Sequence, residues 1–144
     1  CNIDLGKHID RGEHKIGIVF NTDESDKPGK HWISMYVDAL GKNLGGDPGI
    51  YYFDSFGSKP MKEVKGLINT LKNQGKQRNI DFVVSNNDKS FQNNSFSCGF
   101  YCLHFMENMI KGTPFQQYLK SGLNDKKMIE YQRECYLHPE EIKC

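Results

Sequence analysis

The residues of this sequence that could do chemistry together are a cysteine, a histidine and an aspartate. Cys98 opens an apolar helical pattern, behind the polar stretch that begins at Gln92. His31 begins one β-like run, and Asp54 lies in the next run along the chain. A thiol attacks as its thiolate, which a helix N-terminus and a nearby imidazolium both favour. The set therefore predicts a cysteine nucleophile activated by a histidine.

The other groups that acyl transfer needs also have candidates. Asp54 can hold the second imidazole nitrogen and stabilise the imidazolium. Donors aimed at the developing oxyanion are typically worth about 3 kcal/mol each. Gln92 offers a side-chain NH2 six residues before Cys98, whose backbone N–H could be a second donor. Asn93 or Asn94 could replace Gln92 in this role, and Asp38 is a competing acid for the histidine.

Short β-rich runs and helical patterns provide the elements that must position these groups. We expect strands at 15–20, 31–38, 50–56 and 80–84, and helices at about 58–71, 98–111, 115–119 and 125–137. Ser58 is the expected cap of the first helix, with Pro60 in its first turn. Polar residues form a single stripe on the helix that begins at Cys98, so most of it should be buried. This pattern predicts an α+β fold in which a small mixed or antiparallel sheet packs on that central helix.

The glycine-rich segment 39–49 indicates a hairpin between the second and third strands. A symmetric hairpin centred near Lys42 and Asn43 would set His31 opposite Asp54. Alternation would then put His31 on the face of Ile33, Met35 and Val37, and Asp54 on the face of Ile50, Tyr52 and Phe56.

Composition limits the remaining possibilities. The 144 residues are enough for a single domain, 1–144, with a modest core. The net charge of +1 indicates neither a nucleic-acid nor a membrane partner. Five cysteines without a paired spacing favour a reducing compartment. The chain opens at Cys1 rather than Met, so we expect N-terminal elements of the enzyme to be missing.

The sequence resembles the ubiquitin-like-protein-specific cysteine proteases, the clan of the desumoylating enzymes and adenovirus endopeptidase. The likeness lies in the His31-Trp32 pair, the Tyr-Phe-Asp-Ser run at 52–55 and Gln92 six residues before Cys98-Gly99. In the sequence pattern around these positions, the chain is most similar to the polyprotein proteases of large DNA viruses such as African swine fever virus. The resemblance implies a papain-like architecture with no cofactor.

The same resemblance implies roles for single residues. His31 is the general base, Asp54 its orienting acid, Gln92 the oxyanion donor and Cys98 the nucleophile. Trp32 lines a narrow channel that admits small residues, although it could also be only a core aromatic. The resemblance also implies the substrates of the enzyme. These would be polyproteins with Gly-Gly sites, in the host cytoplasm and the virion, or else ubiquitin-like proteins. Gly99, from the residues alone, lets substrate backbone approach closely.

Two interpretations from other classes remain. Cys98, Cys102, Cys135 and His138 could supply four zinc ligands, although one pair would lie inside a helix. Alternatively, the domain could keep the fold and bind without catalysis. We expect no metal, and we expect Cys102 to be a core residue. Leu44-Gly-Gly-Asp47 is a possible site of self-processing.

Overall fold

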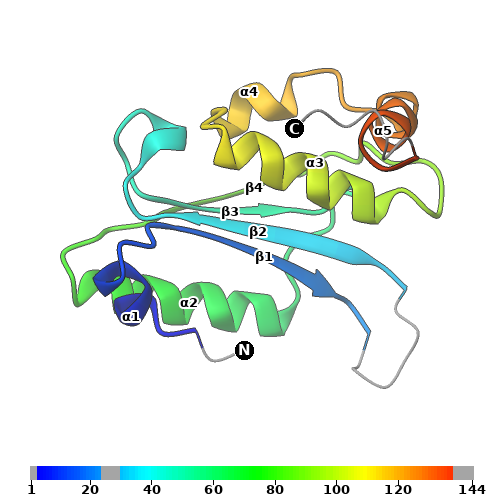
Figure 1. The fold of residues 1–144 in the computed structure, drawn as a ribbon. Coiled ribbons are helices and arrows are strands. Elements are labelled where there is room, and N and C mark those ends of the chain that lie inside the picture. Colours follow the sequence, from blue (N-terminus) through cyan, green and yellow to red (C-terminus); the bar gives the residue numbers. More distant parts are fainter. Residues whose placement is uncertain (1–2, 24–29, 138–144) are drawn as a thin grey trace.

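The computed structural model describes residues 3–23 and 30–137 of the chain as an α+β fold (Figure 1). A four-stranded mixed sheet has the order β1-β2-β3-β4. The second strand runs antiparallel to both the first and the third, and the fourth runs parallel to the third. Their bounds are Lys15–Asn21 for β1, Trp32–Asp38 for β2, Gly49–Phe53 for β3 and Val83–Asn86 for β4. The predicted mixed sheet and fold class are confirmed.

Helices cover both faces of the sheet (Figure 1). On one face lie α1 (Leu5–Asp10), which the sequence did not predict, and α2 (Lys62–Lys76). The other face carries α3 (Cys98–Ile110), α4 (Phe115–Leu119) and α5 (Asp125–Gln132), the last followed by a π-helical turn at Arg133–Leu137. Within the described part of the chain, none of these helices combines the length and hydropathy of a membrane span.

Several boundaries differ from the prediction, and the strand expected at 50–56 ends at Phe53. The helix expected from Ser58 begins at Lys62, because Pro60 disfavours helical backbone at the residue before it and Met61 is extended and packs on the core. The strand expected at 80–84 begins only at Val83, because the N–H of Ile80 still closes the end of α2 on the carbonyl of Gly75. The final helix gives way to the π-helical turn after Gln132.

The hairpin register is two residues away from the prediction. Val37 pairs with Ile50 and Ser34 with Phe53, so the hairpin centre lies beyond Asn43. The buried carboxylate of Asp38 sets this loop by accepting hydrogen bonds from three backbone N–H groups, those of Leu40, Gly41 and Asn43. Asp38 therefore closes the loop at the far end of β2 and does not serve as the competing acid for His31.

Each face of the sheet has its own hydrophobic cluster. Toward α2 lie Ile33, Met35, Val37, Ile50 and Tyr52, as alternation predicts. Toward α3 the ring of Phe53 stacks on that of Phe105, with 5.1 Å between centroids and 10° between planes. This packing ties α3 to β3. The helix is less buried than expected, because Leu103 and Ile110 are exposed on the side away from the sheet.

Candidate active site

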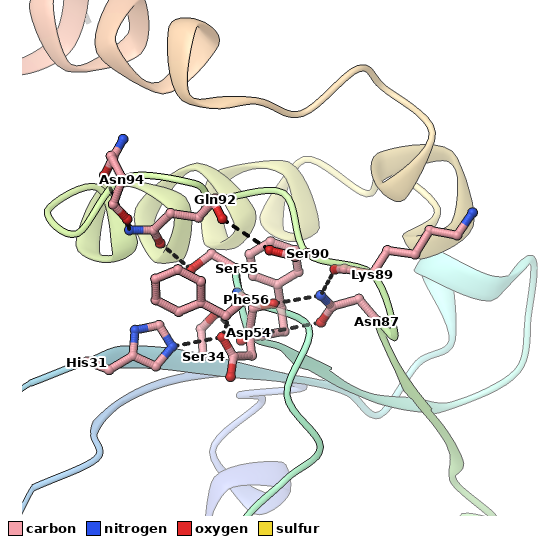
Figure 2. A network of polar contacts seen from close by, with 11 residues as sticks. His31, Ser34, Asp54, Ser55, Phe56, Asn87, Lys89, Ser90, Gln92 and Asn94 are labelled. Atoms are coloured by element: carbon pink, nitrogen blue, oxygen red, sulfur yellow. Dashed lines mark hydrogen bonds and ion pairs between the residues drawn. The ribbon is translucent and has the colours of Figure 1, made fainter.

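His31 and Asp54 are brought together where β2 begins and β3 ends (Figure 2). His31 Nε2 lies 2.7 Å from Asp54 Oδ1. A carboxylate only accepts hydrogen bonds, so this contact places the imidazole proton on Nε2. His31 Nδ1 is buried and has no hydrogen-bond partner among the described residues. Nδ1 therefore makes no hydrogen bond within the described part of the chain and can accept a proton.

The pair forms although the register differs from the prediction. His31 and Asp54 lie one residue outside their strands, so strand alternation no longer governs their side chains. Extending the observed register places Phe56 opposite His31, and the two rings lie 4.9 Å apart. Asp54 then reaches the imidazole as a diagonal neighbour. Its Oδ1 also accepts the backbone N–H of Phe56 at 2.8 Å, which fixes the carboxylate.

Asn87 holds the backbone of Asp54. Its Oδ1 accepts the N–H of Asp54 at 3.0 Å, and its Nδ2 donates to the carbonyl of Asp54 at 2.6 Å. The β3–β4 ladder ends with Tyr52 opposite Asn86, so this buried side chain continues the pairing by one residue. Sequence reasoning missed Asn87. Its only signal was an amide residue directly after a strand.

The loop before Cys98 is built around Gln92, which is 2% exposed. Its Oε1 accepts a hydrogen bond from the hydroxyl of Ser55 at 2.6 Å, and its Nε2 donates to the carbonyl of Asn94 at 2.8 Å. The carbonyl of Ser55 also accepts the backbone N–H groups of Phe91 and Gln92. Figure 2 shows this second set of contacts beside the His31 and Asp54 pair.

Two further residues shape the loop. Asn94 Oδ1 accepts the N–H groups of Phe96 and Ser97, the residues just before α3. Asp125, at the start of α5, accepts the N–H groups of Asn93 and Asn94. Its other oxygen accepts from the hydroxyl of Tyr101. Sequence reasoning missed Asp125, because nothing local links it to the loop. Asn93 is thus held through its backbone N–H, and Asn94 through both its backbone and its side chain.

Cys98 is the first residue of α3 and is 7% exposed. Ser97 precedes it without a side-chain cap, so no hydroxyl competes for the first N–H groups of the helix. A helix N-terminus of this kind favours a thiolate. Gly99 is half-buried, and a Cβ built on it would meet no atom within 4 Å. There is open space beside it, as backbone approach by a substrate requires.

Cys102 differs from Cys98, as expected of a core residue. Burial raises the pKa of its thiol to about 12, although a side-chain hydrogen bond with Ser34 acts in the opposite direction. The charges of Cys98 and Asp54 raise its pKa further. Cys102 therefore lies within electrostatic reach of both the candidate nucleophile and the candidate acid.

Trp32 belongs to neither hydrophobic cluster and is 42% exposed, so it is not a core aromatic.

The zinc hypothesis gains no support. Within residues 3–23 and 30–137, no three histidine, cysteine, aspartate or glutamate side chains gather as a metal site. His138, which that hypothesis needs, lies outside the described residues.

Comparisons with known proteins find a matching family and viral relatives. Residues 14–144 match the model of the Ulp1 protease family, C-terminal catalytic domain. A protein of Acanthamoeba polyphaga mimivirus named as a thiol protease is 32% identical over 124 residues, which are 85% of this chain and 39% of that protein. A cysteine protease of African swine fever virus is 26% identical over 132 residues, 91% of this chain and 47% of the viral protein.

The fold has a counterpart among solved structures. The crystal structure of the selenomethionine form of an African swine fever virus protease aligns with a TM-score of 0.78 at 22% identity, over 92% of this chain and 52% of that one. At this identity the likeness concerns the fold. The chain spans less than half the length of each of these two viral relatives.

Proposed function

The chain belongs to the Ulp1 protease family, and from that premise we propose that it is a cysteine endopeptidase with Cys98 as nucleophile. The observation that carries the proposal is the His31–Asp54 pair, joined at 2.7 Å through Nε2 with Nδ1 left without a partner in the described structure. A histidine that served only the fold would be expected to use both buried nitrogens. Here Nδ1 makes no hydrogen bond to a described residue, so it is the nitrogen that can take up the proton of a thiol.

The proposed reaction begins when His31 Nδ1 takes the proton of the Cys98 thiol. The thiolate attacks the peptide carbonyl, and a C–S bond forms while the carbonyl electron pair moves onto oxygen. Gln92 and the N–H of Cys98 donate to this oxyanion. Its collapse breaks the C–N bond, and the His31 imidazolium protonates the leaving amine. Water, deprotonated by His31, then hydrolyses the thioester and restores the thiol.

Asp54 keeps the imidazole in the tautomer that this reaction uses. Its carboxylate accepts from Nε2 and stabilises the imidazolium that forms after proton transfer. The carboxylate is itself held by the N–H of Phe56. Its backbone is held by Asn87. The acid is thus fixed at both its side chain and its main chain, which supports an orienting role.

We assign specificity for glycine to the surroundings of His31 and Cys98. The indole of Trp32 is exposed and directly follows the base in the chain, where it would narrow the space for a substrate side chain. Gly99 adds no side chain to the space beside the nucleophile. Both features favour cleavage after Gly-Gly-type sites, in a polyprotein or in a ubiquitin-like conjugate. We place this activity in a reducing compartment, the host cytoplasm or the virion of a virus.

Two substrates test the proposal, a fluorogenic peptide ending in Gly-Gly and a full ubiquitin-like protein with a C-terminal reporter. Cys98→Ala should abolish turnover and leave the fold intact, whereas Cys102→Ala serves as the matched control and should retain activity. Cleavage of the short peptide alone indicates polyprotein processing. Preference for the folded partner indicates a deconjugating isopeptidase. Full activity of Cys98→Ala would refute the catalytic assignment.

A further inference from the structure

Ser55 holds Gln92 at both its backbone and its side chain. The carbonyl of Ser55 accepts the N–H of Gln92 at 3.1 Å, and its hydroxyl donates to Gln92 Oε1 at 2.6 Å. Both residues are buried, at 1% and 2% exposure. The two residues are 37 positions apart in the chain, so this contact joins the end of β3 to the loop before α3.

These contacts fix which way the amide of Gln92 points. The carbonyl of Asn94 can only accept, so the nitrogen of the amide must face it. The amide oxygen then faces Ser55, whose hydroxyl must donate. The amide nitrogen carries a second N–H, which has only a longer contact of 3.3 Å with Asn94 Oδ1. This weakly engaged N–H is the one that can turn to a developing oxyanion.

We propose that Ser55 is a positioning residue that orients the side chain of Gln92 and couples it to the acid of the site. Ser55 directly follows Asp54, so one dipeptide fixes the imidazole on one side and the amide donor on the other (Figure 2). Asn87 holds this dipeptide through both backbone groups of Asp54. The inference rests on the proposed function, in which Gln92 stabilises the oxyanion.

The test separates oxyanion stabilisation from thiol activation. Turnover of the Gly-Gly peptide needs both, whereas alkylation of Cys98 by iodoacetamide forms no oxyanion and needs only the activated thiol. Loss of one oxyanion donor costs roughly 10²–10³ in kcat. Ser55→Ala leaves Gln92 in place but unoriented, so kcat/KM should fall about 10- to 100-fold, mainly through kcat. The alkylation rate, followed on the peptide that contains Cys98, should stay within about twofold.

A double-mutant cycle with Gln92→Ala gives the sharper result. If Ser55 acts through Gln92, then Ser55→Ala causes no further loss in the Gln92→Ala background. Ser90→Ala is the matched control, because Ser90 donates to the backbone carbonyl of the same Gln92 and not to its amide. Its kcat/KM should change by less than about twofold. Ser55→Cys keeps the volume with a weak donor and should lie between serine and alanine.

Several outcomes would overturn the inference. One such outcome is that the losses of kcat/KM from Ser55→Ala and Gln92→Ala multiply in the double variant. Another is that the alkylation rate falls in parallel with turnover. Either would show that Ser55 only supports the fold. Unchanged turnover in both Ser55 variants would show no role. If a variant turns substrate over too slowly, protection of Cys98 by a peptide ending in glycinal reports the same hydrogen bonds, because the hemithioacetal that forms places its oxygen where the oxyanion would develop. Failure of the proposed function looks different, since Cys98 would then alkylate no faster than free cysteine.

Discussion

The two halves of the candidate active site are held in place by different kinds of contact. His31 and Asp54 flank paired strands, so the backbone ladder between β2 and β3 positions them. The loop 91–97 before Cys98 lies outside the ladder and is held mainly by individual contacts. The carboxylate of Asp125 accepts two of its backbone N–H groups, and Ser55 binds Gln92 through both its hydroxyl and its carbonyl. The ladder tolerates the loss of one side chain, whereas the loop depends on individual ones. Substitutions in the two halves should therefore separate chemistry from stability.

Among substitutions of the residues that support the nucleophile, Asp54→Asn should have the largest effect, in the half that the ladder positions. Asparagine keeps an oxygen for the N–H of Phe56 but cannot stabilise the imidazolium, so turnover should fall by about 10²–10⁴. The free energy of unfolding, measured in urea, should change by less than about 1 kcal/mol, because the backbone pairing and the contacts of Asn87 remain. Asp81→Asn, at an exposed aspartate just before β4, is the matched control. Activity within threefold of wild type in Asp54→Asn would remove Asp54 from the mechanism.

Asp125→Ala tests the other half. It leaves the N–H groups of Asn93 and Asn94 without their acceptor, and hydrogen bonds to a charged group contribute about 1.5–3 kcal/mol each. The bond to Asn93 is exposed, so water can replace part of what is lost, and we expect the free energy of unfolding to fall by only about 1–3 kcal/mol. Turnover should fall about tenfold or more, since the loop carries Gln92. Urea unfolding and peptide hydrolysis measure the two quantities.

The control for Asp125 must weaken α5 without touching the loop. Asn124 caps α5 by accepting the N–H of Lys127, and its side chain makes no hydrogen bond to the loop among the described residues. Asn124→Ala should cost about 1 kcal/mol of stability and leave turnover unchanged. If both variants lose stability equally and neither loses activity, Asp125 serves only its helix.

The same contrast explains what the sequence could predict. Strand alternation and hairpin length indicated that His31 meets Asp54, although the three backbone contacts of Asp38 moved the register by two residues. Alternation is a local signal, and so are the apolar pattern and position of α3. The contacts of the loop are not local. Ser55 and Asp125 reach it from 37 and 32 residues away, and no periodicity links those positions. Asn87 escaped prediction for the same reason.

A smaller and more selective effect should distinguish the two cysteines of α3. Burial raises the pKa of Cys102 to about 12, so at pH 8 only about one thiol in 10⁴ is ionised. Cys98 should alkylate with iodoacetamide at pH 8, and Cys102 should not react in the folded protein. In the Cys98→Ala variant, mass spectrometry of the peptide from α3 reports the labelling of Cys102 without that of Cys98. Labelling at the rate of a free cysteine there would show that α3 opens readily, and the helix would then be a poor support for the nucleophile.

The smallest expected effect concerns His104, on α3 away from the site. Burial lowers its pKa below 6.5, and the charge of Lys127 and, more weakly, Lys111 act in the same direction, whereas Glu107 opposes them. Its Nδ1 lies 3.2 Å from the hydroxyl of Tyr118, and its ring meets Tyr131 edge-on. The unfolded chain therefore binds a proton at His104 more readily than the folded one.

This difference sets the sign of a pH effect on stability. The contribution of neutral His104 is fully present above about pH 6.5 and is lost as the pH falls from there toward the lowered pKa of the folded state. His104→Gln removes that loss, so its melting temperature should decline less than that of wild type between pH 7.5 and 5.5. Parallel declines would show that His104 titrates alike in both states. Because His104 lies two helical positions from Cys102, a parallel result would also argue that this part of α3 is more open to water than its packing on Tyr118 and Tyr131 indicates.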